Sequence, residues 1–538
     1  MPLVSPRSRR GRALALLAGA VLIAATGCRN EQARQSPEEG RANAGRTIAC
    51  PPPDPKHDPN ATFTWMYSVD NTSFDPDRIT TNNSLMYLYP LYDALTHIDA
   101  DGKVEPMLAK SWRLLEDNKV LEMKLVENAK FHDGTPIDAD AVRANIERHR
   151  DLKGSYNAGE LETVKSVEAV DQHTVRFVTE DGAAPLVNTL AGSAGMMMSP
   201  RVLDDKNQAS KPTGGSGAFK MTRSVSGDRV EYTAVDDYWD PDAQNVKKLV
   251  MLISGDDNAR LSAVTTGAAD ATFLRVQMID PAKKAGLIIC QKPNASSYTI
   301  SLNTKRSKFG DRRVRLALNH AINRDGISQL LNGLCQPSAQ LLPRNMFGAD
   351  PSLTPGFYRH DPGKAKELLR QAGLSKGFQF EMQVINLDIY LQIAQLIQQN
   401  LSDVGIKMDI HPVPIAKLGE DFSVNKTVDA SLSEQKAELD PSILTADYYL
   451  PDGFSNPGGF TTPELTRLHE EGLKGGSDAE RAPVYAKLMR AAAKEAAPNL
   501  TLCHVTSPSA MNKKVNGLEI YADASRQFRG VSMTPNRK

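Results

Sequence analysis

Hydrophobic residues recur along the chain with two periods, and the clearest example lies between residues 378 and 410. Apolar and polar residues alternate over 378–384, which predicts a strand. Over 389–404 the apolar residues fall on one face of a helix, and Gly405 follows, where a helix C-terminus favours glycine. Alternation returns over 406–410. Together these segments predict a β-α-β unit of a mixed or parallel sheet.

Three further helices have clear start signals, each an aspartate that can cap the first turn. Asp138 and Asp311 precede two runs with helical spacing of apolar residues. Asp361 precedes a third run, in which Pro362 occupies the first turn and Gly373 marks the end. Strand-like and helix-like runs alternate over the rest of the body, so we expect an α/β protein with mixed sheets flanked by helices.

The start of the chain has the pattern of an export signal. Arginines over 7–12 precede an apolar run, Ala13 to Ala25, that is too short to cross about 30 Å of hydrocarbon. The run leads through small residues into Cys28, which resembles a bacterial lipobox. We expect residues 1–27 to be a lipoprotein signal peptide and Cys28 to carry the lipid. An ordinary cleaved signal peptide with an incidental Cys28 is the alternative.

Residues 28–59 are polar and rich in proline, which predicts a tether between a membrane and the folded body. No second apolar stretch of 18 or more residues follows in the sequence.

Composition limits the classes of function. A chain of 538 residues, 40% of them hydrophobic, is too long for one compact core, so two or three lobes are expected. Its 64 basic and 64 acidic residues cancel, and no basic stripe is present, so nucleic acid is not an expected partner.

Catalytic motifs are incomplete. The run Gly214-Gly215-Ser216-Gly217 is followed by Ala218 and so fails as a nucleophile elbow. Ser433-Glu434-Gln435-Lys436 matches Ser-x-x-Lys without the companion motifs of that enzyme class. The ten histidines show no metal-ligand spacing, and there is no phosphate-binding or dinucleotide fingerprint. We therefore predict a binding protein with no catalytic residue, metal site or cofactor.

Four cysteines follow Cys28 in the sequence: Cys50, Cys290, Cys335 and Cys503. An exported protein meets an oxidising environment, which predicts one or two disulfides. Four cysteines allow three full pairings, and the sequence does not choose between them.

A collinear set of segments, from about residue 60 to residue 520, resembles family 5 of the extracellular solute-binding proteins, the oligopeptide, dipeptide and nickel receptors of ABC importers. The segments that carry the resemblance are Leu108 to Trp112, Phe131 to Val142, Pro212 to Phe219, Asp237 to Trp239, Ala259 to Asp270, Asp311 to Arg324 and Tyr358 to Gly373. We expect Arg312, Arg313, Arg315 and Arg324 of this set to form a solvated helix face and cap contacts.

The resemblance implies a two-lobed periplasmic-binding fold with an extra subdomain in lobe I. Lobe I would span 60–298, lobe II 299–507, and residues 508–538 would return to lobe I. A peptide or peptide-like solute would be engulfed between the lobes and passed to an ABC permease with its ATPase subunits. The protein would be a monomer anchored by lipid on the outer face of the cytoplasmic membrane, in the periplasm where an outer membrane exists.

The resemblance also places a ligand loop at Leu432 to Pro441. Ala437 occupies the position at which peptide receptors of the family hold the ligand α-amine with an acid, and Glu434 stands where tryptophan is common. Glu434 or Glu438 could supply the missing charge, because an ammonium taken out of water needs a carboxylate. Asp440 is the weaker candidate, since an acid before proline has a turn role.

Family topology alone suggests further ligand-binding positions, whose polar or aromatic side chains could contact a buried solute. They are Asn82, Asn83, Ser84, Gly214, Ser216, Asn303 and Tyr448. Two alternatives stay open at this point: a secreted hydrolase on the same fold, and a receptor for a non-peptide ligand such as a metal chelate or a signalling molecule.

Overall fold

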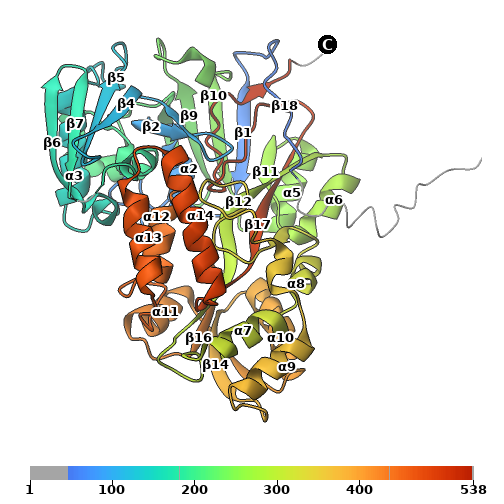
Figure 1. Cartoon of the computed structure of the whole chain (residues 1–538). Coiled ribbons are helices and arrows are strands. Elements are labelled where there is room, and N and C mark those ends of the chain that lie inside the picture. The colour runs from blue at the N-terminus through green and yellow to red at the C-terminus, as the bar shows by residue number, and fades with distance from the viewer. Residues whose placement is uncertain (1–46, 181, 436, 536–538) are drawn as a thin grey trace, which may run out of the picture. The chain divides into compact units, whose positions relative to one another are not determined.

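A large mixed sheet runs through the body of the protein in the computed structural model, which describes residues 47–180, 182–435 and 437–535 (Figure 1). Its strands pair in the order β15 (Lys407–Val413), β14 (Gln379–Ile385), β16 (Ala430–Gln435), β12 (Ile288–Leu302), β17 (Asn499–Met511), β11 (Ala271–Phe273), β1 (Thr62–Tyr67), β10 (Lys248–Ile253), β9 (Arg229–Ala234) and β8 (Phe219–Val225). A short strand, β13 (Cys335–Pro337), also pairs with β17.

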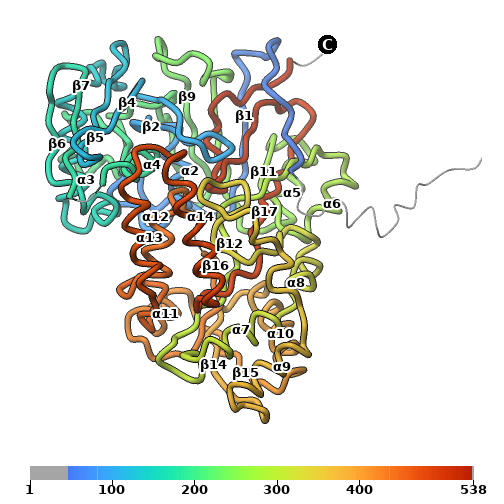
Figure 2. Tube along the Cα trace, viewed as in Figure 1, coloured from blue at the N-terminus to red at the C-terminus, as the bar shows by residue number. Residues whose placement is uncertain are grey.

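Strands β12 and β17 connect two hydrophobic cores. They pair antiparallel from Ile288 opposite Met511 to Ser301 opposite Asn499, with the register shifting on the way. One end lies in a core with Trp65, Leu249 and Met511, and the other in a core with Ile300, Met382 and Leu500. We call the part around the first core lobe I and the part around the second lobe II; both can be followed along the trace in Figure 2. The lobe boundaries given above stay predictions.

The predicted β-α-β unit is confirmed in lobe II. Strands β14 and β15 are parallel, and α10 (Asp388–Ser402) connects them. Gly405 takes a φ of +85° after this helix. A Cβ on Gly377 would lie 1.7 Å from the carbonyl oxygen of Gly405, so only glycine allows the two turns to meet this closely.

The three predicted helix caps are also confirmed. Asp138 accepts from the Ala141 amide before α3 (Ala139–Asp151), and Asp311 accepts from the Arg313 amide before α7 (Arg312–Ala321). Asp361 accepts from the Lys364 amide before α9 (Pro362–Gln371).

The expectation of a solvated arginine face on α7 is wrong for two of its four members. Arg312 and Arg313 are exposed, but Arg315 and Arg324, the latter at the start of α8 (Arg324–Leu330), are buried. Their guanidinium groups donate to main-chain carbonyls, Arg315 to Ala496 at 2.6 Å and Arg324 to Thr501 at 2.8 Å. Arg315 therefore fastens α7 to the segment before β17, and Arg324 fastens α8 to β17 itself.

Lobe I includes an extra subdomain with a core of its own. It has a sheet in the order β4 (Ala109–Leu115), β5 (Val120–Leu125), β7 (Thr174–Thr179) and β6 (Val164–Asp171). Helix α3 packs against this sheet through Val142 and Ile146, which join Phe131 and Phe177 in the core.

Lobe II includes a helical part built around Leu444, Leu468, Tyr485 and Leu488. Its helices are α12 (Pro441–Tyr449), α13 (Pro463–Lys474) and α14 (Asp478–Lys494). The remaining helices and short strands are α2 (Leu85–Leu88), α4 (Leu186–Thr189), α5 (Asp257–Thr266), α6 (Ile279–Lys284), α11 (Ile415–Gly419), β2 (Thr96–Ile98), β3 (Val104–Pro106), β18 (Val515–Asn516) and β19 (Ser532–Met533).

The prediction of disulfides is confirmed, and the structure selects the pairing. Cys50 bonds Cys290, and Cys335 bonds Cys503. The first bond fastens the end of the predicted tether to β12, where Ile48 and Gln291 also exchange main-chain hydrogen bonds of 2.8 and 2.9 Å. The predicted signal peptide, Cys28 and the first part of the tether lie outside the described residues. Among the described residues, no helix is long and apolar enough to span a bilayer.

Candidate functional site: a cavity between the lobes

A cavity of about 560 Å³ lies between the lobes, a size suited to a small solute. Lobe I lines it with Asn83, Tyr89, residues 188–189 and 191–193, and residues 523–525 and 527. Lobe II lines it from the end of β16 and the segment before α12, with Tyr390 of α10 beside them. Both lobes therefore present side chains to one shared space.

Glu434 stands at the lobe II side of this cavity, near the end of β16. The Ser296 hydroxyl donates to one carboxylate oxygen at 2.8 Å, and the Tyr390 hydroxyl donates to the other at 3.3 Å. The side chain is exposed, but the surface it exposes faces the cavity. Burial among the surrounding protein raises the pKa of Glu434, and the two hydrogen bonds offset only part of this rise.

Asp440 also lines the cavity, yet its carboxylate is already paired. Arg481 of α14 binds it with two hydrogen bonds, of 2.7 and 2.8 Å, and both side chains are buried. Asp440 further accepts from the Ser442 amide as the N-cap of α12, and from the Asn188 side chain at 3.1 Å. Its role is to hold helices together at the cavity wall.

Glu438 and Ala437 lie on the same wall, and both are half-buried. The methyl group of Ala437 brings no charge to the position where the family pattern has an acid. Of the predicted acids, Glu434 thus has its carboxylate turned to the cavity, where two hydroxyl groups are its hydrogen-bond partners among the described residues.

The predicted lobe I segment contributes one described side chain. Asn83 lines the cavity and accepts from the Tyr67 hydroxyl at 2.9 Å. Ser84 is buried behind it, bonded to the Thr72 side chain at 2.9 Å. The side chain of Asn82 lies outside the described part of the structure.

Four other predicted ligand positions are not among the described residues that line the cavity. Ser216 is buried and donates to the Met197 carbonyl at 2.7 Å, and a Cβ on Gly214 would lie 2.2 Å from the Val202 side chain. Asn303 accepts from the Lys305 amide at 3.1 Å in a turn, and Tyr448 is packed in the α12–α14 core. Each has a structural role in its own neighbourhood.

Asp523, which the sequence analysis missed, lines the lobe I side of the cavity. Its carboxylate accepts from the Tyr89 hydroxyl at 3.3 Å and from the Ser525 amide at 2.9 Å. Ala524, next to it, takes a φ of +68°, which sharpens the turn. Asp523-Ala524-Ser525 follows no periodic pattern, so only the fold brings this acid to the cavity.

Two buried amide side chains also line the cavity, and the sequence analysis missed both. Gln435 is 3% exposed and accepts from the Ser297 hydroxyl, while its Nε2 has no partner among the described residues. Asn188 is 9% exposed and donates to Asp440, while its Oδ1 has no partner there. One donor and one acceptor buried in the cavity wall are therefore left without a partner among the described residues.

No group of three or more His, Cys, Asp or Glu side chains in the described part of the chain is arranged to hold a metal ion.

A two-lobed α/β body with a polar cavity between its lobes defines a solute-binding protein of the periplasmic-binding type. The model for bacterial extracellular solute-binding proteins, family 5, matches residues 103–464, and the chain belongs to this family.

Similar proteins agree with this assignment. The glutathione-binding protein GsiB of Pectobacterium atrosepticum is 26% identical over 485 residues, covering 86% of this chain and 92% of that protein. The structure of HbpA2 from Haemophilus parasuis has a TM-score of 0.79 at 22% identity, covering 88% of this chain and all of that chain. The structure of DppA from Helicobacter pylori, in complex with the peptide STSA, has a TM-score of 0.73 at 23% identity. The match covers 88% of this chain and 98% of that chain. The first of these is a glutathione-binding protein, and the third is a periplasmic binding protein associated with an ABC transporter.

Proposed function

We propose that the protein captures a peptide or peptide-like solute in the interlobe cavity and delivers it to the permease of an ABC importer. The observation that carries this proposal is the cavity itself, which is lined by both lobes of a family 5 solute-binding fold. The glutathione-binding relative supports a peptide-like ligand, because glutathione is a small peptide.

Capture follows from the connection between the lobes. Strands β12 and β17 are the long crossing elements, and a solute that contacts both lobes favours the form in which the lobes are closed. Since only the closed form makes all contacts at once, a ligand of the right length stabilises it.

Thermal unfolding with and without peptides tests the proposal. We expect one or more members of a panel of di- and tripeptides, glutathione included, to raise the melting temperature, by the equivalent of about 2.7 kcal/mol at a hundredfold excess over Kd. Native mass spectrometry of protein purified without added ligand checks whether such a solute co-purifies. If no panel member shifts the melting curve, or if a peptide is cleaved, the receptor proposal is wrong.

Lipid anchoring at Cys28 completes the proposal, since it would keep the receptor near its permease. We expect Cys28→Ala to move the protein from the membrane fraction to the soluble fraction, because the substitution removes the lipidated thiol. Cys28→Ala protein that stays with the membrane would contradict the anchor, and Ser5→Ala, in the same signal segment, serves as the control.

A further inference from the structure

Two carboxylates reach the cavity from opposite lobes. Glu434 belongs to β16 of lobe II, and Asp523 belongs to the C-terminal return into lobe I. A tyrosine hydroxyl donates to each at 3.3 Å, Tyr390 to Glu434 and Tyr89 to Asp523. No ion pair joins either carboxylate to a lysine or arginine within the described residues.

Basic side chains near the cavity are occupied elsewhere. The described residues that line it include no lysine, arginine or histidine. Arg481 is committed to Asp440. Arg526, close to Asp523 in the chain, interacts with it electrostatically but donates its hydrogen bonds to the Ala524 carbonyl and, at 3.0 Å, to the Ser509 hydroxyl. Among the described residues, carboxylates thus line the cavity from both lobes, and a positively charged solute would complement them.

Two buried amides in the cavity wall each leave one polar atom without a partner among the described residues, the Gln435 Nε2 and the Asn188 Oδ1. A buried donor or acceptor left unpaired costs about 1–3 kcal/mol, so a rearrangement of the wall that brings either atom to a ligand would recover that cost. Gln435 belongs to the same wall as Glu434 and Asp440, and Asn188 belongs to the opposite, lobe I wall.

We infer that the cavity selects a small solute that presents two positively charged groups, one held by Glu434 and the other by Asp523. The inference rests on the proposed receptor function and names the substrate class. Lys-Lys carries three ammonium groups and can present two of them to these acids, and a linear diamine carries the two positive charges alone.

Calorimetry with probes of defined charge tests the inference. The probes are Lys-Lys, Ala-Ala, Glu-Glu and 1,4-diaminobutane, and the proteins are the parent, Glu434→Gln, Asp523→Asn and the control Glu381→Gln. Glu381 is an exposed glutamate of β14, outside the cavity lining, and it matches the Glu434 substitution in chemistry. Melting curves without ligand check that each variant folds.

We expect Lys-Lys to bind the parent at least about 30-fold more tightly than Ala-Ala, and each cavity variant to lose about 30-fold in affinity for Lys-Lys. The control should bind as the parent does. Equal affinities for the three dipeptides would overturn the inference and leave the receptor function standing. Binding of the diamine without any dipeptide would keep the inference and remove the peptide from the proposed function. Failure of both Lys-Lys and the diamine to bind, or full affinity in both cavity variants, would overturn the inference.

Discussion

At the residue scale, similar acids at one cavity wall have different roles because their partners differ. Glu434 is held by two neutral hydroxyl groups, whereas Asp440 is bound by a buried guanidinium. Sequence reasoning selected both from one loop. It ranked Asp440 lower for its turn role before proline, but it could not predict the ion pair, because Arg481 lies 41 positions further along the chain and nothing local indicates that it folds back.

Removing the Asp440 charge should strongly destabilise the fold. Asp440→Asn removes the bidentate partner of the buried Arg481 guanidinium and leaves only the partly exposed Asp478 carboxylate, at 3.7 Å, as a counter-charge, so we expect the free energy of unfolding to fall by about 3–5 kcal/mol. Urea unfolding of the ligand-free protein measures this loss. Glu471→Gln is the matched control, since its pair with Arg467 is solvent-exposed and such helix pairs contribute about 0.3–0.5 kcal/mol. A loss no larger than that of the control would contradict a structural role for Asp440.

At the element scale, the parts that could be predicted are those specified by local patterns. Three features depend on residues only a few positions apart: the β14-α10-β15 unit, the aspartates that cap helices and the glycines that follow helix C-termini. The structure has each of them where it was predicted. The order of the strands depends instead on partners far apart in sequence, such as Ser297 of β12 and Gln435 of β16. The two buried arginines at α7 and α8 were misjudged for the same reason, since their carbonyl partners come from residues 496 and 501.

The disulfides illustrate the same limit. The predicted export signal indicated that cysteines would be oxidised, but the sequence did not determine the pairing. Strand β12 brings Cys290 next to Cys50, and strand β17 brings Cys503 next to Cys335. For the candidate site, the resemblance located the wall with Glu434, whereas Asp523 and Asn188 needed the fold.

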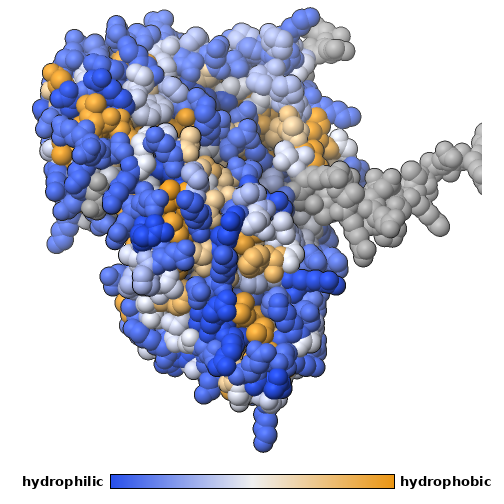
Figure 3. All heavy atoms as spheres, in the orientation of Figure 1, coloured by the Kyte–Doolittle hydropathy of each residue, from blue (hydrophilic) through white to orange (hydrophobic). Residues whose placement is uncertain are grey.

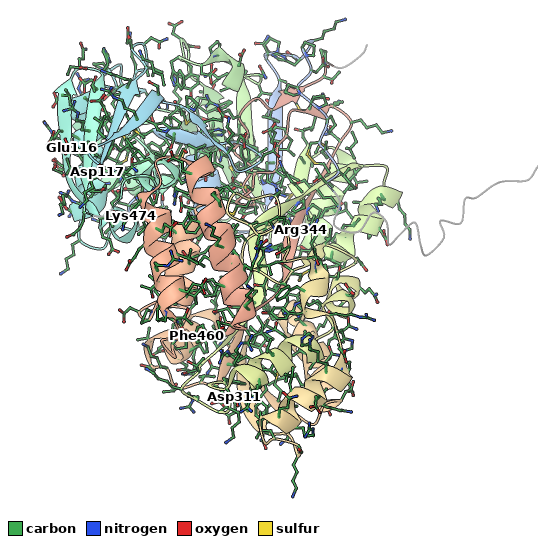
Figure 4. All side chains as sticks on the ribbon, in the orientation of Figure 1. Glu116, Asp117, Asp311, Arg344, Phe460 and Lys474 are labelled. Atoms are coloured by element: carbon green, nitrogen blue, oxygen red, sulfur yellow. A yellow bond between two sulfur atoms is a disulfide. The ribbon has the colours of Figure 1, made fainter. Side chains whose placement is uncertain are left out.

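At the scale of the whole molecule, the lobes also meet outside the cavity, where the extra subdomain contacts α13. Asn118 of the β4–β5 turn donates to the carbonyl of Lys474 at the end of α13. Three successive residues of this turn, Glu116, Asp117 and Asn118, have φ of 53°, 53° and 66°, a conformation that costs energy in side-chain-bearing residues. Figure 4 labels Glu116 and Asp117 on the turn and Lys474 across the boundary between the lobes. The face in Figure 3 is largely hydrophilic, with scattered hydrophobic patches.

Gly182 makes this contact sensitive to a single methyl group. A Cβ at Gly182 would lie 2.5 Å from the carbonyl oxygen of Leu473 in α13, so Gly182→Ala should push the subdomain away from α13 and disfavour the closed form. We expect about 5- to 150-fold weaker binding of the panel peptide that gives the largest thermal shift, although no cavity residue changes.

Calorimetry measures the affinity, and X-ray scattering measures the radius of gyration with ligand. The melting temperature without ligand should stay close to that of the parent. Gly159→Ala in the same subdomain is the control, because its added Cβ would meet nothing within 4 Å. If Gly182→Ala binds and compacts as the control does, the contact between the subdomain and α13 does not contribute to closure.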